Sequence, residues 1–299
     1  MPTTKRSRRY WLNLLWFGLS TLLILLIGAY FALIVDSITR PVRHPLGKVT
    51  PADAGLDYVN LTMTGYNGVP LAGWYIPSKN SAAVILIHGY ASNRLGVMLQ
   101  AEMLARNGYG VLLYDQRGCG ESGGDYLTWG WLDVYDVPSA ITYLKQRIEI
   151  DPQRIGILGL STGGEVAMQA AAQYTELKAV VSDGAGFSAA SDLPPMTNFK
   201  DWFMTLPDPL ILQAVEWRTG TRPPAPLHDA IARIAPRPLL LISTGLDYEK
   251  RQSEWYYQFA GDPKSLWNIP EASHTGGPLV RPAEYEAKIV SFFEQALLK

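Results

Sequence analysis

The sequence has 299 residues, and its 26 Lys and Arg almost balance its 27 Asp and Glu, so the formal net charge is −1. This balance gives no sign of nucleic-acid binding, which favours a basic surface. The only cysteine, Cys119, excludes an internal disulfide. We find no metal-binding cluster, no dinucleotide-binding glycine motif after a strand and no internal repeat, and we therefore expect no cofactor and no metal.

An uncharged apolar segment occupies residues 10–35. It is long enough to cross a bilayer as a helix, which takes about 20 residues. Its aromatic residues Tyr10, Trp11, Trp16 and Tyr30 suit the boundary between lipid and water. We predict one transmembrane helix here. A cleaved signal peptide is the alternative, although its apolar core normally has only about 7–15 residues.

Basic residues on the N-terminal side predict the orientation of this helix. Residues 1–9 contain Lys5, Arg6, Arg8 and Arg9. By the positive-inside rule, this basic N-terminus stays in the cytoplasm, and the rest of the chain lies on the extracytoplasmic face. The basic residues beyond the helix weaken this asymmetry without reversing it. Residues 36–54 hold three prolines and are predicted to link the helix to one domain over residues 55–299.

Short apolar runs alternate with helix-like segments through this domain. The predicted strands lie at residues 56–63, 71–76, 83–87, 109–114, 154–158, 179–182 and 238–243. The predicted helices lie at residues 95–106, 132–147, 163–173 and 281–298. Such alternation predicts an α/β fold with a mostly parallel, doubly wound sheet.

The sequence Gly159-Leu160-Ser161-Thr162-Gly163 lies between an apolar run and a helix-like segment. This is G-x-S-x-G in a strand–turn–helix setting, which is typical of a nucleophile elbow. The serine would lie on a sharp, strained turn, where side chains two positions away on either side would clash. Glycines occupy both positions. We therefore predict that Ser161 is a nucleophile, with the N–H groups at the start of the next helix directed towards it.

Two further strand ends extend this pattern. His88-Gly89 follows the run 83–87, and Asp115-x-Arg-Gly-x-Gly-x-Ser follows the run 109–114. Together with the serine elbow, these motifs resemble the α/β-hydrolase superfamily over about residues 55–299. The resemblance implies the α/β-hydrolase fold, and the wording of the motifs is similar to that of the esterase and serine-aminopeptidase-like branch.

The histidines are assigned by the chain order that the family implies, which is nucleophile, acid, histidine. The sequence has four histidines, at positions 44, 88, 228 and 274. The resemblance makes His88 structural. His274 lies in a loop after the last short strand, where the family places its general base.

The orienting acid has three candidates. Asp247 follows the predicted strand 238–243 and is the expected acid, because the family usually places it there. Asp183, one strand earlier, is the rival, and Glu249 is a weaker substitute on the same loop as Asp247. The acid would accept the N–H of His274 and stabilise the imidazolium.

An oxyanion hole is implied by the same resemblance. One donor would be the backbone N–H of Thr162, after the nucleophile, and the other the N–H of Tyr90, after His88-Gly89. The chain lacks a His-Gly-Gly-Gly run, which separates it from the hormone-sensitive-lipase branch. A serine nucleophile argues against dehalogenase and epoxide hydrolase chemistry.

Residues 184–227 interrupt the strand–helix alternation and are rich in proline and aromatic residues. In this superfamily such a segment commonly forms a cap over the active site. The aromatic residues are Phe187, Phe199, Trp202, Phe203 and Trp217. Both packing and substrate contact are open for them, because aromatic stripes form cores and also line ligand pockets. For Trp202 and Phe203 we expect contact with the acyl group.

The resemblance as a whole implies a membrane-anchored serine hydrolase. Its partners would be the membrane and a small-molecule acyl substrate, an ester, thioester or small amide cleaved through an acyl-enzyme. Two alternatives use the same fold. One is a non-catalytic, membrane-tethered binding protein, since a fold alone does not define a function. The other is a serine haloperoxidase-like activity.

Overall fold

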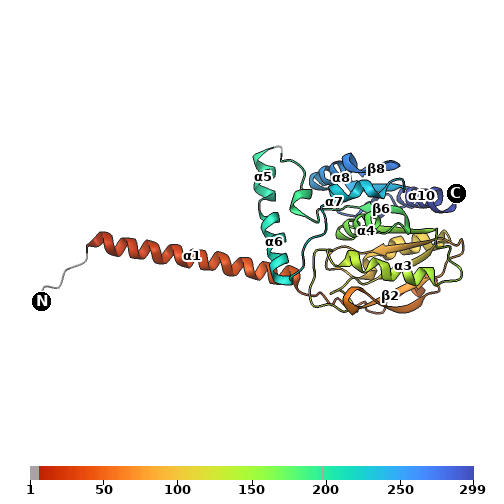
Figure 1. The fold of residues 1–299 in the computed structure, drawn as a ribbon, viewed down its shortest axis with the longest axis horizontal. Helices are drawn as coiled ribbons and strands as arrows, with labels where there is room; N and C mark the ends of the chain where they lie inside the picture. Colours follow the sequence, from red (N-terminus) through yellow and green to blue (C-terminus); the bar gives the residue numbers. More distant parts are fainter. Residues whose placement is uncertain (1–6, 197) are drawn as a thin grey trace.

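The computed structural model describes residues 7–196 and 198–299, and its centre is an eight-stranded sheet (Figure 1). The strands lie in the order β1-β2-β4-β3-β5-β6-β7-β8. Their bounds are β1 Val59–Thr64, β2 Pro70–Ile76, β3 Ala83–Ile87, β4 Gly110–Tyr114, β5 Ile155–Leu160, β6 Leu177–Asp183, β7 Leu239–Thr244 and β8 Lys264–Ile269.

Only the β1–β2 and β2–β4 pairs are antiparallel, and the strands from β4 to β8 pair in parallel. Every residue of β3, β4, β5 and β7 is buried. This is what a parallel sheet covered on both faces requires, and it explains why these strands are uninterrupted apolar runs in the sequence.

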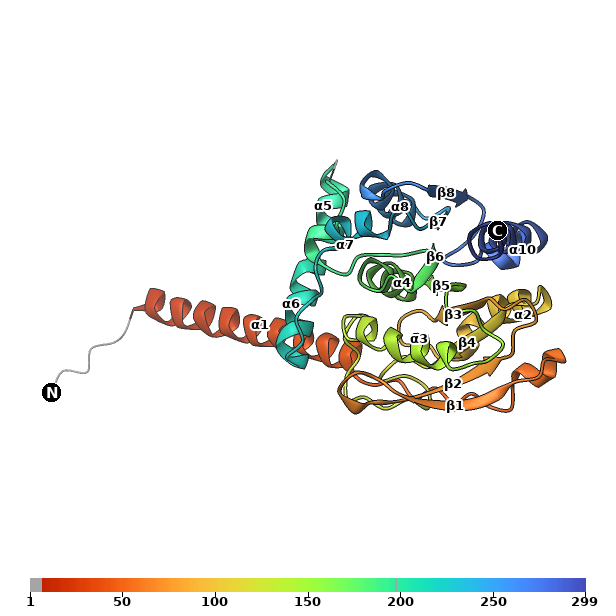
Figure 2. The same cartoon turned by 45° about the vertical axis from the view of Figure 1, so that its right-hand side comes forward.

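Helices cover both faces of the sheet (Figure 2). One apolar cluster includes residues of α3 (Val137–Lys145), α4 (Thr162–Gln173), α7 (Leu227–Ala230) and α8 (Asp247–Phe259). The cluster on the other face includes residues of α2 (Met98–Arg106), α10 (Pro282–Phe293) and η7 (Glu294–Leu298). The prediction of a mostly parallel, doubly wound sheet is therefore confirmed.

Helix α1 (Arg8–Thr39) projects from this body as a long arm (Figure 1). Ser7 caps its start, and the helix ends just before Pro41, which cannot continue a helix. Only Val35 and Thr39 are buried in it. By length and composition it is the one helix of the described residues that could span a membrane. Of the predicted basic segment 1–9, residues 1–6 lie outside the described residues.

The segment after α1 is bound to the domain. Val42 donates its N–H to Gly118 O at 2.8 Å and accepts the N–H of Gly120 at 3.1 Å. Arg43 donates to the carbonyl of Gly124 at 2.9 Å. The residues predicted as a linker, 36–54, therefore hold the end of α1 against the body by specific hydrogen bonds.

The interruption predicted at residues 184–227 forms a helical segment between β6 and α7. It contains η5 (Ala190–Asp192), α5 (Phe199–Thr205) and α6 (Pro207–Thr219). Helix α6 buries Leu212, Ala214 and Val215. Its Leu212 and Val215 share an apolar cluster with Ile38, near the end of α1.

Candidate active site

Ser161 lies on the turn between β5 and α4, in a backbone conformation that is rare for a side-chain-bearing residue. Its φ is 54° and its ψ is −126°. Such strain persists only where the surroundings enforce it, and it concentrates at functional sites. Here Ser161 donates its N–H to Asp183 O at 2.8 Å, and its carbonyl accepts the N–H of Gly164 at 2.7 Å. The elbow predicted from G-x-S-x-G is present.

The glycines of the motif are required by close backbone contacts. A Cβ atom on Gly159 would lie 1.9 Å from Gly163 O, and one on Gly163 would lie 2.4 Å from Ile87 O. Both obstacles are backbone atoms, which no side-chain rotation can move. Gly89 is less crowded, because its Cβ would lie 3.3 Å from the Cβ of Ser161.

We expect Gly163→Ala to destabilise the protein strongly, because β3 and the start of α4 would have to separate. Gly89→Ala is the comparison variant and should lower the stability less, since the nearest atom to its new Cβ would be a side-chain carbon at 3.3 Å. Thermal unfolding of both variants checks this order. An equal midpoint for Gly163→Ala and the wild type would contradict it.

His274, in the loop after β8, points at the serine. Its Nε2 lies 2.9 Å from Ser161 Oγ. The ring packs over Gly184, where a Cβ atom would lie 3.4 Å from His274 Cε1. The structure therefore brings together the predicted nucleophile and the predicted base, from positions 113 residues apart.

Glu249 contacts the other nitrogen of this histidine. Its Oε1 accepts from His274 Nδ1 in a short hydrogen bond, and its Oε2 accepts from Thr244 N at 3.1 Å and Thr244 Oγ1 at 2.6 Å. The side chain is fully buried. Burial alone would raise the pKa of Glu249, but the hydrogen bonds from His274 and Thr244 outweigh it and hold the pKa below its ordinary value.

The expectation that Asp247 contacts His274 is therefore wrong for this structure. Asp247 is the first residue of α8 and is exposed, whereas Glu249 is buried. Side chains two positions apart on a helix point about 200° apart, so only one of the two acids can face His274. The register of α8 directs Glu249 inwards.

The rival acid, Asp183, has another role. It is completely buried at the end of β6, and its Oδ2 accepts the Tyr285 hydroxyl at 2.8 Å. Burial raises the pKa of Asp183 to about 7, which the Tyr285 hydrogen bond partly opposes. Its backbone carbonyl accepts the N–H of Ser161, so Asp183 stabilises the backbone of the elbow.

The hydrogen bond that His274 donates to Glu249 raises the pKa of His274, and burial partly opposes this rise. In the neutral ring, Nδ1–H donates to Glu249 and Nε2 is left to accept the proton of Ser161. This is the tautomer that a general base needs. Tyr248 Oη lies 3.4 Å from the same Nδ1 and is the more distant neighbour.

Two backbone N–H groups lie beside the serine. Thr162 begins α4, so its N–H has no acceptor within the helix, and Tyr90 follows Gly89, whose Cα approaches Ser161. Among the described residues, neither N–H donates a hydrogen bond. Both remain predicted oxyanion donors.

His88 is held by the backbone, as the resemblance implies. The ring is fully buried. Its Nε2 accepts a hydrogen bond from the backbone N–H of Gln116 at 2.9 Å, and its Nδ1 donates one to the carbonyl of Gly89 at 2.7 Å. Burial lowers the pKa of His88, which keeps the ring neutral. The side chain fixes the loop that carries Tyr90.

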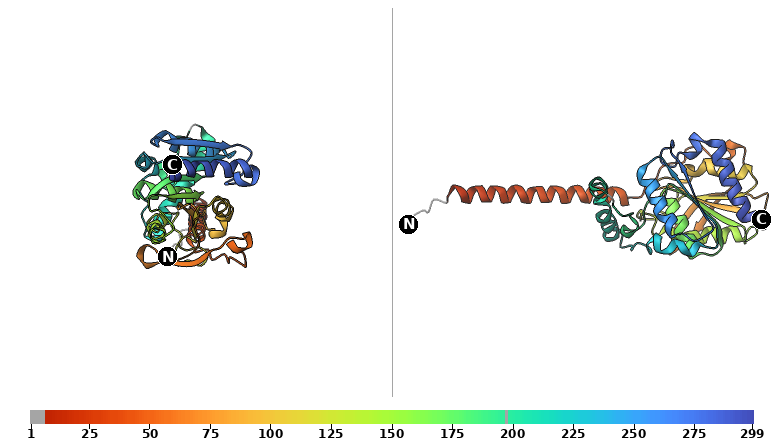
Figure 3. Two further views of the ribbon diagram at one scale, coloured as in Figure 1. Left: turned by 90° about the vertical axis from the view of Figure 1, so that its right-hand side faces the viewer. Right: turned by 90° about the horizontal axis from the view of Figure 1, so that it is seen from above.

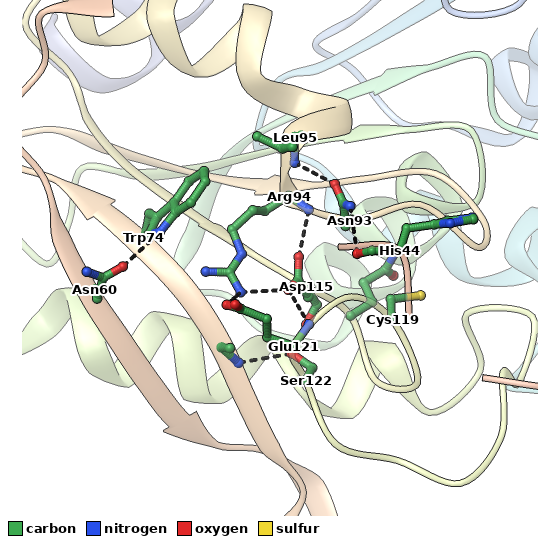
Figure 4. Close-up of polar contacts among 12 residues, drawn as sticks. His44, Asn60, Trp74, Asn93, Arg94, Leu95, Asp115, Cys119, Glu121 and Ser122 are labelled. Atoms are coloured by element: carbon green, nitrogen blue, oxygen red, sulfur yellow. Dashed lines mark hydrogen bonds and ion pairs between the residues drawn. The ribbon is translucent and has the colours of Figure 1, made fainter. Parts of the chain in front are cut away.

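The Asp115 motif is structural too (Figure 4). Asp115 is fully buried and accepts from Arg94 N at 2.7 Å, Arg94 Nη2 at 2.6 Å and Glu121 N at 2.8 Å. Arg94 is itself buried and lies over the ring of Trp74. The carboxylate therefore ties β4 to the start of η3 (Arg94–Val97).

Arg94→Ala should lower the free energy of unfolding by about 3–5 kcal/mol, because it leaves the buried Asp115 carboxylate without a charged partner. Arg106→Ala is the control. Arg106 forms exposed ion pairs with Glu102 and Glu286, which are worth about 0–1 kcal/mol. Urea unfolding curves of both variants measure the difference. Similar midpoints would contradict the structural role.

A small recess adjoins the two predicted oxyanion donors. Its cavity volume is about 10 Å³, and its lining includes Tyr90, Thr162, Cys119 and Trp129. Trp129 packs against the ring of Tyr90, with centroids 5.1 Å apart, and against Phe187 at 6.2 Å. Within the described residues, no group of three or more His, Cys, Asp or Glu side chains could hold a metal ion.

The other aromatic residues of residues 184–227 do not line this recess. Phe199, Trp202, Phe203 and Trp217 are exposed. The expectation that Trp202 and Phe203 contact the acyl group therefore gains no support from this structure. Trp129, which precedes the cap in the chain, lines the recess. A single tryptophan in a turn gives no periodic pattern by which the sequence could have identified it.

Comparison with known proteins supports the fold. A solved esterase, Pf2001 of Pyrococcus furiosus, superposes with a TM-score of 0.71 and 26% identity, covering 87% of this chain and 98% of its own. The uncharacterized protein YfhR of Escherichia coli O157:H7 is 28% identical and covers 80% of this chain and 81% of its own. The thiohydrolase aneE of Aspergillus aculeatus is 32% identical over 42% of this chain and 41% of its own.

The family model described as serine aminopeptidase, S33, matches residues 78–233. The matched range includes the serine elbow, the His88-Gly89 turn and the Asp115 turn. It ends before Glu249 and His274. The chain belongs to this hydrolase family and, with the sheet and elbow described above, to the α/β-hydrolase superfamily.

Proposed function

We propose that this protein is a membrane-anchored serine hydrolase that cleaves small acyl esters or thioesters through an acyl-enzyme. The observation that carries the proposal is the continuous hydrogen-bonded series from Ser161 through His274 to Glu249. A nucleophile, a base and an orienting acid in contact are the parts that acyl transfer needs. The esterase and thiohydrolase relatives support this reaction class.

In the acylation step, Ser161 Oγ attacks the acyl carbonyl while His274 Nε2 takes its proton. The carbonyl oxygen, on which negative charge develops, accepts hydrogen bonds from the backbone N–H groups of Tyr90 and Thr162. The buried Glu249 stabilises the imidazolium that forms. His274 then gives its proton to the departing alcohol or thiol, and the acyl group remains on Ser161.

In the deacylation step, a water molecule takes the place of the leaving group. His274 removes a proton from the water, and the hydroxide adds to the acyl carbonyl. The second oxyanion collapses, the acid departs, and the proton returns to Ser161 Oγ. One ester and one water thus give one carboxylic acid and one alcohol.

The recess beside Tyr90 favours a short acyl group. Its cavity volume of about 10 Å³ is far below the roughly 300–1,000 Å³ of sites for drug-sized ligands, so an acyl group that enters it must be small. The ring of Trp129 closes part of it. The acyl group would enter this recess, and the leaving group would point away from it.

The anchor is the remaining part of the proposal. Helix α1 has 32 residues, almost all exposed, and no charged residue between Arg9 and Asp36. An isolated apolar helix of this length is stable in a bilayer and is unfavourable in water. By the positive-inside rule, its N-terminus lies in the cytoplasm and the hydrolase domain on the other face.

Fluorophosphonate labelling of the full-length protein, followed by hydrolysis of nitrophenyl esters of increasing acyl length, tests this function. We expect labelling at Ser161 and the fastest turnover for short acyl chains. Trp129→Ala should shift the preference towards longer chains, because it opens the recess. Trp202→Ala, at an exposed tryptophan, is the matched control and should leave the profile unchanged. An unlabelled protein would contradict the proposed chemistry.

A further inference from the structure

Helices α5 and α6 carry a row of exposed apolar side chains that no part of the described chain covers. Its members are Phe199, Trp202, Phe203, Leu206, Leu210 and Trp217. Their exposed fractions reach 76% at Phe199 and 79% at Trp217. We call this set the cap row. Soluble monomers seldom expose apolar patches of this kind, so the row indicates a binding surface.

The cap row is separate from the packing face of the same segment. Helix α6 buries Leu212 and Val215 against Trp131 in the body, so its packing requirement is met by other residues. Phe199 stacks on Trp202 and Phe203, with ring centroids 5.9 and 6.4 Å apart. The row is therefore an ordered outer surface of aromatic rings.

The position of the cap row relative to α1 indicates what binds to this surface. Asp36 is the first charged residue after Arg9, so the apolar part of α1 ends there. Helix α6 crosses α1 at this level, because Arg218 pairs with Asp36 at 3.4 Å and Ile38 packs in the cluster of Leu212. In a bilayer spanned by α1, this level is the boundary between lipid and water.

The direction of the helices fits that boundary. Figures 1 and 3 show α5 and α6 running across the axis of α1, between the projecting arm and the body. If α1 crosses a bilayer, α5 and α6 lie along its surface. Amphipathic helices that bind in the interface adopt this orientation, and Trp and Phe are favoured at that depth.

We propose that the cap row inserts into the lipid–water interface of the bilayer that α1 spans. The inference rests on the anchoring part of the proposed function and not on catalysis. It gives a single lipid-binding surface, formed by α1 and the cap row together. The apolar cluster of Trp131, Leu212 and Val215 contains both Ile38 of α1 and Trp129, and Trp129 packs on the ring of Tyr90. This cluster then lies directly behind the membrane surface.

Fluorescence quenching in vesicles of zwitterionic phospholipid tests the proposal with the full-length protein. Phe203→Cys is labelled with a nitrobenzoxadiazole fluorophore, and the vesicles contain lipids with nitroxide quenchers at the interface. Trp217→Cys provides a second position in the row. Cys119 is only 2% exposed, so the wild type measures the background labelling.

Two labelled positions serve as references. Leu23→Cys lies in the middle of α1 and reports anchoring. Ile148→Cys is the matched control, because Ile148 is an equally apolar, fully exposed residue that precedes the start of β5, whereas Ser161 follows the end of this strand. We expect interfacial quenchers to remove most of the emission at positions 203 and 217 and almost none at position 148.

Each other result overturns the inference. If Leu23→Cys is quenched by lipids with deep quenchers and positions 203 and 217 are not quenched, α1 is an anchor but the cap row stays in water. If quenching at 203 disappears when labelled protein is diluted with unlabelled protein, the row contacts a second copy. If no position is quenched, the anchoring fails together with the inference, while fluorophosphonate labelling still tests catalysis.

Discussion

Ser161→Ala is expected to abolish both fluorophosphonate labelling and ester hydrolysis. The Ser161 hydroxyl is the group at the elbow that His274 Nε2 contacts, and its loss removes the atom to which the acyl group binds. Loss of a member of such a triad costs on the order of 10⁴ to 10⁶ in kcat. The measurement is the rate of nitrophenyl acetate hydrolysis by the purified full-length variant.

Two variants make this test specific. His274→Ala should cost about as much as Ser161→Ala, because the two residues act as a unit and the losses do not add. Ser139→Ala, on the remote helix α3, should retain full activity, since its hydroxyl only donates to the carbonyl of Thr64. If Ser161→Ala retained more than a small fraction of the wild-type activity, the reaction would use another nucleophile.

The serine elbow was predictable because its pattern lies in consecutive residues. Gly159 is required by the backbone of Gly163 in the same turn, and Gly163 is required by Ile87 O on the adjacent strand β3. The residues that meet both requirements are nevertheless five consecutive ones, so the pattern is visible in the sequence. The alternation of buried strands with helices is visible in the same way. Each parallel strand is an apolar run that stands out from the sequence on either side.

The acid was less predictable because it depends on where a helix begins. Asp247 and Glu249 both follow β7 and lie on one turn of α8. The sequence favours the earlier residue by its distance from the strand. Which acid faces His274 depends on the rotation of α8 about its axis, and this is set by packing against residues far away in the chain. Burial separates the two only in three dimensions.

The cap was predictable as an interruption of the strand–helix alternation. Which of its aromatic side chains face the body and which face outwards was not predictable. An aromatic row at helical spacing is compatible with a core, a ligand pocket or a membrane surface, and all three favour the same residues. The structure separates them, because Phe203 and Trp217 are exposed while Leu212 and Val215 pack inwards. The role of the exposed residues is therefore a property of the fold as a whole.

Glu249→Gln is expected to reduce turnover strongly and to change its dependence on pH. The amide keeps the shape of the side chain, but its NH₂ group can donate to His274 Nδ1, which leaves the proton on Nε2 and blocks acceptance of the Ser161 proton. An equivalent change in a related triad type costs about 10⁴ in kcat. Glu249→Asp, which keeps the charge but is one methylene shorter, should lose less.

The pH profile separates this role from a merely structural one. Hydrolysis needs neutral His274, so kcat/KM rises as the pH passes upwards through its pKa. Glu249 raises the pKa of His274, so removing the carboxylate should move this acid limb to lower pH while the plateau falls. Asp247→Asn is the matched control, since that carboxylate is exposed and should change neither the plateau nor the limb. The assignment of Glu249 fails if Asp247→Asn shifts the acid limb of the pH profile and Glu249→Gln does not. The exposed Asp247 would then be the acid that sets the pKa of His274 during turnover.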